Sequence, residues 1–200
     1  GTMKEDVQIR SARLEDCADI ARLFLISSEG LAEYIWSRID LPGLSTIEIG
    51  ARRYAREGTT FSYENCLVAD RAGDVLGMVH GFPMEAQSAD SDDSPDPVLA
   101  PYAELEDIGS FYLSGVALYP QYRGLGIGTR LLDAARDRAR ALGLERLSLI
   151  CFERNQQATR LYLRLGYVEI DRRAIVSHPA LRYRDGDAVL LVRPLDRPGA

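Results

Sequence analysis

The sequence has no long apolar run, few cysteines and no excess of basic residues, and each shortage excludes a class of protein. No apolar stretch approaches the roughly 18 residues that suggest a membrane-spanning helix. The first residues are polar, so we expect no secretory signal peptide. The 24 basic residues are outnumbered by 30 acidic ones, and the net charge of −6 argues against sequence-independent binding to nucleic acid. We therefore expect a protein with neither a membrane nor a nucleic acid as partner.

The cysteines and histidines form no recognisable metal site. Cys17, Cys66 and Cys151 are odd in number, widely spaced and set among apolar residues. This pattern predicts buried free thiols, which fit the reducing cytoplasm. His80 and His178 are isolated in the sequence, and no third ligand accompanies either of them. We expect no bound metal and a cytoplasmic location.

The length of 200 residues suits one domain with a sizeable core, which we place at residues 3–196. Gly1 and Thr2 stand before Met3 and resemble the remnant of an expression tag. Residues 85–100 combine aspartates with serines and prolines, which predicts a mobile acidic loop. A solvated insertion is the favoured interpretation of this loop, and an acidic lid over an amine pocket is the alternative.

Hydrophobic periodicity predicts an α+β protein. We expect a helix along the apolar positions from Leu14 to Leu25, with Ser11 as its N-cap. Gly143 and Gly166 are expected to end two later helices. Strands are expected at 7–10, 66–69, 75–81, 111–118, 146–152 and 187–193, and further helices at 31–36, 45–57, 129–142 and 156–165. With an early hairpin, this order predicts a mixed, largely antiparallel twisted sheet with helices on both faces.

The most informative segment runs from Val116 to Thr129. It reads as a buried strand, a tight turn and three alternate glycines at 124, 126 and 128 that lead into a helix. A helix N-terminus offers unpaired N–H groups and a partial positive charge, and glycines let a ligand approach the backbone closely. The segment therefore predicts a cradle for a pyrophosphate or similar anion. A dinucleotide fingerprint would need glycine or alanine where Thr129 stands, and a P-loop would need a lysine that the turn lacks.

A second segment, from Asn155 to Tyr167, follows one predicted helix and one predicted strand later. Gln121-Tyr122-Arg123-Gly124-Leu125-Gly126 fits the Gln/Arg-x-x-Gly-x-Gly/Ala acyl-CoA signature of the GNAT superfamily of N-acetyltransferases. Asn155, Tyr162 and Leu165-Gly166-Tyr167 fit its second conserved block. The two blocks in this order make the chain similar to that superfamily, clearly over residues 110–172 and more loosely from residue 7.

The resemblance implies a splayed central strand pair and acetyl-CoA as co-substrate. It implies that amides of Gly124–Thr129 bind the CoA pyrophosphate, and that amides of Val116–Leu118 serve the pantetheine arm and the thioester oxygen. Tyr162 would donate a proton to the departing CoA thiolate, and Asn155 would cap its helix and contact the cofactor. The implied cofactor-binding set is Val116, Ala117, Leu118, Arg123, Gly124, Leu125, Gly126, Ile127, Gly128, Thr129 and Asn155.

The sequence does not identify the general base. Deprotonating an ordinary alkyl amine at pH 7 costs roughly 4–5 kcal/mol, so some group must assist. Some ribosomal-protein acetyltransferases of the superfamily carry a glutamate at the position of Ile150. The remaining acidic candidates, acting directly or through water, are Glu104, Glu106 and Asp107. Other pocket candidates are Tyr112, Ser114 and His80.

These observations lead to one functional expectation with alternatives. We expect transfer of an acetyl group from acetyl-CoA to a primary amine of a small molecule, peptide or protein, by direct attack in a ternary complex. The alternatives are a non-catalytic acyl-CoA-binding module, transfer of another acyl group, or transfer to a hydroxyl. The acceptor and the oligomeric state, a homodimer included, stay open.

Overall fold

The computed structural model describes residues 6–86 and 96–196. They form two compact units: unit 1 runs to Phe82 and adds Ser114–Arg138, and unit 2 comprises Pro83–Leu113 and the chain from Ala139 onward. Strand β4 (Phe111–Leu118) and helix α5 (Ile127–Ala141) each pass from one unit to the other. Most of the predicted acidic loop and the predicted tag remnant lie outside the described residues. The assignment of 3–196 to a single domain stays a prediction.

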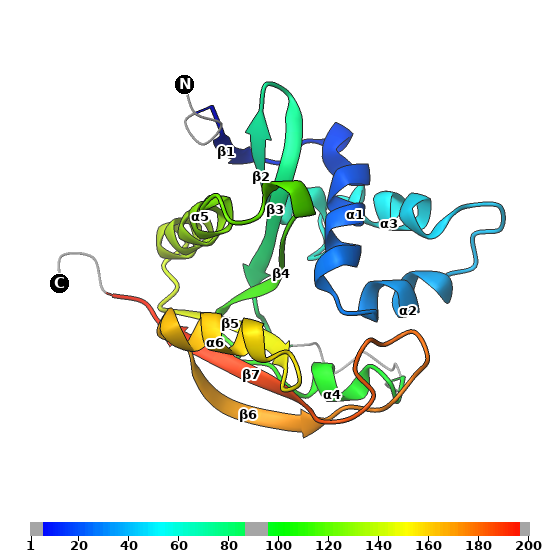
Figure 1. The fold of residues 1–200 in the computed structure, drawn as a ribbon, viewed down its shortest axis with the longest axis vertical. Helices are drawn as coiled ribbons and strands as arrows, with labels where there is room; N and C mark the ends of the chain where they lie inside the picture. Colours follow the sequence, from blue (N-terminus) through cyan, green and yellow to red (C-terminus); the bar gives the residue numbers. More distant parts are fainter. Residues whose placement is uncertain (1–5, 87–95, 197–200) are drawn as a thin grey trace. The chain divides into compact units, whose positions relative to one another are not determined.

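The sheet of unit 1 begins with the predicted hairpin. β1 (Gln8–Ser11) pairs antiparallel with β2 (Cys66–Arg71), and β2 pairs antiparallel with β3 (Asp74–Pro83; Figure 1). Ala72 and Gly73 both have positive φ, at 52° and 91°, which is the geometry of a tight two-residue hairpin turn. The amide of Tyr119, just after β4, donates to the carbonyl of Leu76 at 3.0 Å and joins β3 to the end of β4.

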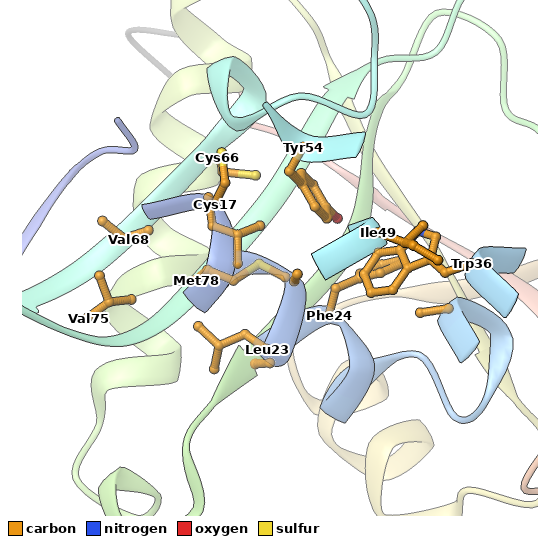
Figure 2. Close-up of a cluster of buried hydrophobic side chains, with 14 residues drawn as sticks. Cys17, Leu23, Phe24, Trp36, Ile49, Tyr54, Cys66, Val68, Val75 and Met78 are labelled. Carbon is orange, nitrogen blue, oxygen red and sulfur yellow. The ribbon is translucent and has the colours of Figure 1, made fainter. Parts of the chain in front are cut away.

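Three helices of unit 1 enclose an aromatic core. α1 (Cys17–Ser27), α2 (Leu31–Ser37) and α3 (Thr46–Tyr54) pack against one another. Figure 2 shows Phe24, Trp36 and Tyr54 from these helices in one buried cluster with Met78 of β3. The prediction of Ser11 as an N-cap is wrong. Ser11 ends β1, and a 3-10 turn (Leu14–Asp16) leads into α1.

Unit 2 is built on the start of β4, then β5 (Arg146–Phe152), β7 (Asp187–Pro194) and β6 (Val168–Ala174; Figure 1). β4 and β5 are parallel, and their register pairs Phe111 with Leu147 and Tyr112 with Ser148. β5 pairs antiparallel with β7 along its whole length. The short β4–β5 register is what a splayed pair of parallel strands produces.

Helices α4 (Ala100–Ala103) and α6 (Gln156–Arg164) belong to unit 2. α4 is a single turn, and α6 lies beside β5. Gly143 and Gly166, with φ of 77° and 95°, closely follow the last residues of α5 and α6 and terminate these helices, as predicted. β6 was not predicted, because its charged residues hide the alternation of a strand.

The described strands follow the order β1-β2-β3-β4-β5-β7-β6, which confirms an α+β fold with a mixed, largely antiparallel sheet. Across the two described ranges, no helix combines the length and the apolar character needed to cross a membrane.

Candidate active site

The glycine turn of unit 1 has the backbone geometry of an anion cradle. Gly124 and Gly126 have φ of 78° and 81°, a region that side chains other than glycine rarely adopt. A Cβ built on Gly124 would meet no atom within 4 Å, so the turn is open on that side. α5 begins at Ile127, one residue after the turn. Its first-turn amides, from Ile127 to Thr129, have no acceptor within the helix, as at any helix start.

The backbone amide of Arg123, unlike its side chain, is already hydrogen-bonded. Its amide donates to the carbonyl of Pro120 at 3.3 Å, so this N–H closes the preceding turn. Its side chain is exposed, as are Gly124, Leu125 and Gly126. Any role of Arg123 toward an anion therefore belongs to its guanidinium group.

Two side-chain contacts hold the turn in place within unit 1. The Tyr119 hydroxyl donates to the carboxylate of Asp19 on α1. The guanidinium of Arg71, the last residue of β2, lies over the ring of Tyr122, 5.4 Å from the ring centroid, and forms a cation–π pair. Burial, with the hydrogen bond to Asp19, raises the pKa of Tyr119 to about 12. Tyr119 therefore stays a neutral donor at physiological pH.

The strand before the turn is held by a close backbone approach. Ala117 is buried, whereas Val116 and Leu118 are half-buried. Gly77 of β3 faces this segment: a Cβ there would lie 2.7 Å from the carbonyl oxygen of Ala117. Sequence analysis missed Gly77, although a glycine inside a strand is a known signal of close approach.

Gly115 of β4 leaves space for a neighbouring helix. A Cβ on Gly115 would lie 3.1 Å from both Phe24 Cδ2 and Ser27 Oγ. Gly115 thus gives room to the last turns of α1, which pack directly over β4.

In unit 2, Asn155 caps α6 as predicted. Its side chain accepts a hydrogen bond from the amide of Ala158 at 3.1 Å. Its carbonyl accepts one from the Thr159 hydroxyl at 3.0 Å. Because that hydroxyl hydrogen is used, the Cys151 thiol of β5 is the donor in its 3.7 Å contact with Thr159 Oγ1. Cys151 is buried, and this burial raises the pKa of its thiol.

Tyr162 lies half-buried on α6 and packs edge-on against Tyr167, with ring centroids 5.4 Å apart. The amide of Tyr167 donates to the carbonyl of Tyr162 at 3.0 Å, which ties the end of α6 to the chain beyond. Burial raises the pKa of Tyr162 to about 12, and nearby Cys151 contributes. Tyr162 is therefore protonated throughout the neutral range.

The candidates for the general base differ in burial and in hydrogen-bond partners. His80 is fully buried, with Nε2 2.9 Å from the Thr60 carbonyl and Nδ1 3.1 Å from the Tyr54 hydroxyl. The carbonyl can only accept, so Nε2 carries the proton and Nδ1 accepts from Tyr54. His80 is a core residue, and its interpretation as a pocket residue is wrong. Ile150 packs in an apolar cluster with Leu105 and Leu190.

The acidic candidates lie in unit 2. Arg146 forms a bidentate ion pair with Asp107, with Nε 2.9 Å from Oδ2 and Nη2 3.2 Å from Oδ1. Glu104 is exposed and pairs with Arg173 at 3.3 Å. Glu106 is half-buried, and burial raises the pKa of its carboxyl group. Within residues 6–86 and 96–196, no cluster of three or more histidine, cysteine, aspartate or glutamate side chains is arranged to hold a metal.

The structure thus places the predicted residues in two groups. Val116–Leu118 and Arg123–Thr129 form one continuous strand, turn and helix start in unit 1. Asn155 caps α6, and Tyr162 lies about two turns later on the same face of that helix, in unit 2.

The fold and the glycine turn define a class of acyl-transferring proteins, and comparison with known proteins bears this out. The model of the acetyltransferase (GNAT) family matches residues 35–167. The chain therefore belongs to the GNAT acetyltransferase family.

Individual relatives agree with this assignment. The uncharacterized N-acetyltransferase YycN of Bacillus subtilis (strain 168) is 38% identical over 60 residues, which cover 30% of this chain and 38% of YycN. A crystal structure of an acetyltransferase superposes with a TM-score of 0.62 at 26% identity, covering 94% of this chain and 100% of the other. The putative acetyltransferase yncA from Salmonella typhimurium, solved with acetyl-CoA, gives a TM-score of 0.58 at 21% identity, covering 97% and 96%.

Proposed function

We propose that this protein transfers an acetyl group from acetyl-CoA to a primary amine of a small molecule, peptide or protein, by direct attack in a ternary complex. One observation carries the proposal: a turn with two positive-φ glycines leads directly into the open amides of α5. Membership of the acetyltransferase family supports acetyl-CoA as the donor.

In this proposal the backbone of unit 1 holds the cofactor. Amides from Gly124 to Thr129 bind the pyrophosphate, helped by the positive end of the α5 dipole. Amides of Val116–Leu118 bind the pantetheine arm and the thioester oxygen, where negative charge develops during attack. Asn155 adds a polar contact to the cofactor.

Tyr162 is proposed as the group that donates a hydrogen bond, and then a proton, to the departing CoA thiolate. An ordinary thiol has a pKa near 8.5, well below the value of about 12 for Tyr162, so complete proton transfer from the phenol alone is uphill. Tyr162 therefore acts first as a hydrogen-bond donor to the departing sulfur. Tyr162 can transfer its proton to the sulfur when it receives, in exchange, the proton that the attacking nitrogen releases.

A second candidate function is a non-catalytic acyl-CoA-binding module. The observation in its favour is the apolar packing of Ile150, where some relatives place a basic glutamate. This alternative requires acetyl-CoA binding without acceptor-dependent turnover. Transfer of a longer acyl group or to a hydroxyl is distinguished by the donor and acceptor that support turnover.

Calorimetric titration with acetyl-CoA tests the cradle. Gly126→Asp adds a carboxylate where the pyrophosphate is proposed to bind, and we expect at least a tenfold loss of affinity. Gly143→Asp is the matched control, because Gly143 also has positive φ, at 77°, but lies at the opposite end of α5. Equal affinities for both variants would show that the cradle is assigned wrongly.

A further inference from the structure

Helix α1 contacts both ends of the backbone that is proposed to hold the thioester. Near the start of α1, the carboxylate of Asp19 accepts a hydrogen bond from the hydroxyl of Tyr119, the residue after β4. At the end of α1, Phe24 and Ser27 face Gly115, where a Cβ would lie 3.1 Å from Phe24 Cδ2 and from Ser27 Oγ. All five residues belong to unit 1, so the arrangement lies wholly within one unit.

The spacing of these contacts is the same on the helix and on the strand. From Asp19 to Ser27 a helix rises roughly 12 Å. From Gly115 to Tyr119 a strand extends about 13 Å. The two segments therefore run alongside each other, in opposite directions, over nearly the same length. The proposed thioester amides of Val116–Leu118 lie between the two contacts, and the glycine turn comes shortly after Tyr119.

Tyr119 is held through its backbone as well as through its side chain. Its amide donates to the carbonyl of Leu76 on β3, and its carbonyl accepts from the amide of Tyr122, each at 3.0 Å. Its hydroxyl donates to a charged acceptor, and such hydrogen bonds are stronger than those between neutral groups. The Asp19 carboxylate is itself held by Arg22, which lies 3.7 Å away on the next turn of α1.

A second contact holds the end of the short 3-10 turn Pro120–Tyr122. The guanidinium of Arg71 lies over the ring of Tyr122, 5.4 Å from its centroid, and Arg71 is the last residue of β2. This contact therefore comes from the β2–β3 hairpin and not from α1. Gly124 and Gly126 follow, and they have no side chains of their own to restrict the backbone. The position of the glycine turn therefore depends on the residues just before it.

We propose that Tyr119 and Tyr122 are positioning residues, which use α1 and the β2–β3 hairpin to fix the glycine turn relative to the thioester amides of β4. The inference rests on the proposed acetyl-CoA site and adds the side chains that hold its two parts at a set spacing. In this role neither tyrosine contacts the reacting atoms. A ligand that binds both parts at once loses affinity when the spacing is loose, because binding must then order the turn.

The test compares two donors that share the pantetheine arm. Acetyl-CoA carries the pyrophosphate, whereas S-acetylpantetheine lacks it and has no group for the glycine turn. We expect Tyr119→Phe, which removes only the hydroxyl, to weaken acetyl-CoA binding about tenfold in calorimetric titration. Its affinity for S-acetylpantetheine, measured by ligand-observed NMR, should stay within about twofold of the wild-type value.

Variants of matched chemistry separate positioning from a general loss of structure. Tyr63→Phe is the control, because Tyr63 donates to the exposed carboxylate of Glu57 at 2.9 Å, in the segment of unit 1 between α3 and β2. This variant should keep wild-type affinity for both donors. Asp19→Ala should lose as much acetyl-CoA affinity as Tyr119→Phe, and Asp19→Asn, which keeps an acceptor oxygen, should lose less.

Two further comparisons address the contacts themselves. The double variant Tyr119→Phe/Asp19→Ala should lose no more affinity than either single variant, because both remove the same hydrogen bond. Arg71→Lys keeps a cation that can lie over Tyr122, so it should bind acetyl-CoA more tightly than Arg71→Gln does.

Each other outcome overturns the proposal in a distinguishable way. Unchanged acetyl-CoA affinity in Tyr119→Phe would show that the contact with Asp19 does not position the turn. Equal losses on both donors would indicate a structural effect that reaches the strand. Wild-type protein that does not bind acetyl-CoA would overturn the proposed function itself, and the role of both tyrosines with it.

Discussion

Gly77 of β3 and Leu118 of β4 approach so closely that only a glycine fits between the strands. A Cβ on Gly77 would lie 2.3 Å from Cδ2 of Leu118. Its other near neighbour is the carbonyl oxygen of Ala117, at 2.7 Å. The absence of a side chain at Gly77 therefore allows the backbone of β4 that is proposed to bind pantetheine to lie where it does.

Gly77→Ala should displace this backbone and weaken acetyl-CoA binding. Overpacking costs about 1–3 kcal/mol, so we expect a loss of affinity of about tenfold or more, measured by titration well below the unfolding temperature. Adding Leu118→Ala removes the conflict with Cδ2 and should restore part of the affinity. Unchanged binding in Gly77→Ala would show that the β3–β4 approach does not position the cofactor.

Replacing Gly50 of α3 with alanine should not give the stabilisation that alanine usually gives in a helix. In an open helix, replacing glycine with alanine gains about 1 kcal/mol. Here a Cβ would lie 2.4 Å from Cζ3 of Trp36, a buried ring of the core. We expect Gly50→Ala to lower the free energy of unfolding by about 1–3 kcal/mol in chemical denaturation. The loss should shrink in a Trp36→Phe background, and a gain in stability would contradict the packing.

His80 should make stability depend on pH in the mildly acidic range. Burial lowers its pKa to about 4, against an unfolded value near 6.5, so the folded state disfavours the charged form. This contribution is fully present above pH 6.5 and is lost as pH falls toward 4, by up to roughly 3 kcal/mol. Denaturation curves of His80→Gln should lack this part of the pH dependence. The same slope in wild type and variant would show that another group titrates.

Asp16 should stabilise unit 1 through its ion pair with Arg10. Arg10 contacts Asp16 at 2.8 Å and also Asp70 at 2.8 Å, and the Asp16 side chain is only 6% exposed. Burial alone would raise the pKa of Asp16, but hydrogen bonds from Arg10 and from the amide of Arg13 lower it overall. The stabilisation is therefore present above the unfolded pKa of about 4 and is lost as pH falls through the folded value.

Asp16→Asn should lower the free energy of unfolding at pH 7 by about 3 kcal/mol, because it leaves Arg10 with less compensation. The control is Asp133→Asn, whose carboxylate is 51% exposed and lies 3.6 Å from Arg136. An exposed pair of this kind contributes less than about 1 kcal/mol. Losses of equal size in the two variants would contradict a special role for the buried pair.

The sequence predicted most of the fold where local chemistry decides it. The glycine ends of α5 and α6, the Asn155 cap and the β2–β3 hairpin all follow from short-range rules, and the structure shows them. β6 escaped prediction because Glu169, Asp171 and Arg172 face charged partners across the surface. Arg172, for example, reaches Glu153 at 2.8 Å and Asp187 at 3.1 Å.

The candidate site was predictable only in part, for a related reason. The glycine turn and the Tyr162 block are contiguous in sequence, so their pattern is visible. The contacts of His80 with Thr60 and Tyr54, the Gly77–Leu118 approach and the pairing of Asp107 with Arg146 join residues 20 to 41 positions apart, so local patterns do not reveal the partners. The same limit applies to Glu106, which looks like its two acidic neighbours until their partners are known.

The central claim is acetyl transfer to an amine, and it is tested most directly by free-thiol release from acetyl-CoA. The wild-type protein is assayed with a panel of amines, polyamines, amino acids and peptides, and the product is examined by mass spectrometry. The account predicts release that depends on an acceptor, with one acetyl group added to that acceptor, and a strong reduction in Tyr162→Phe. Tight acetyl-CoA binding with no release across the panel would contradict it and favour the acyl-CoA-binding module.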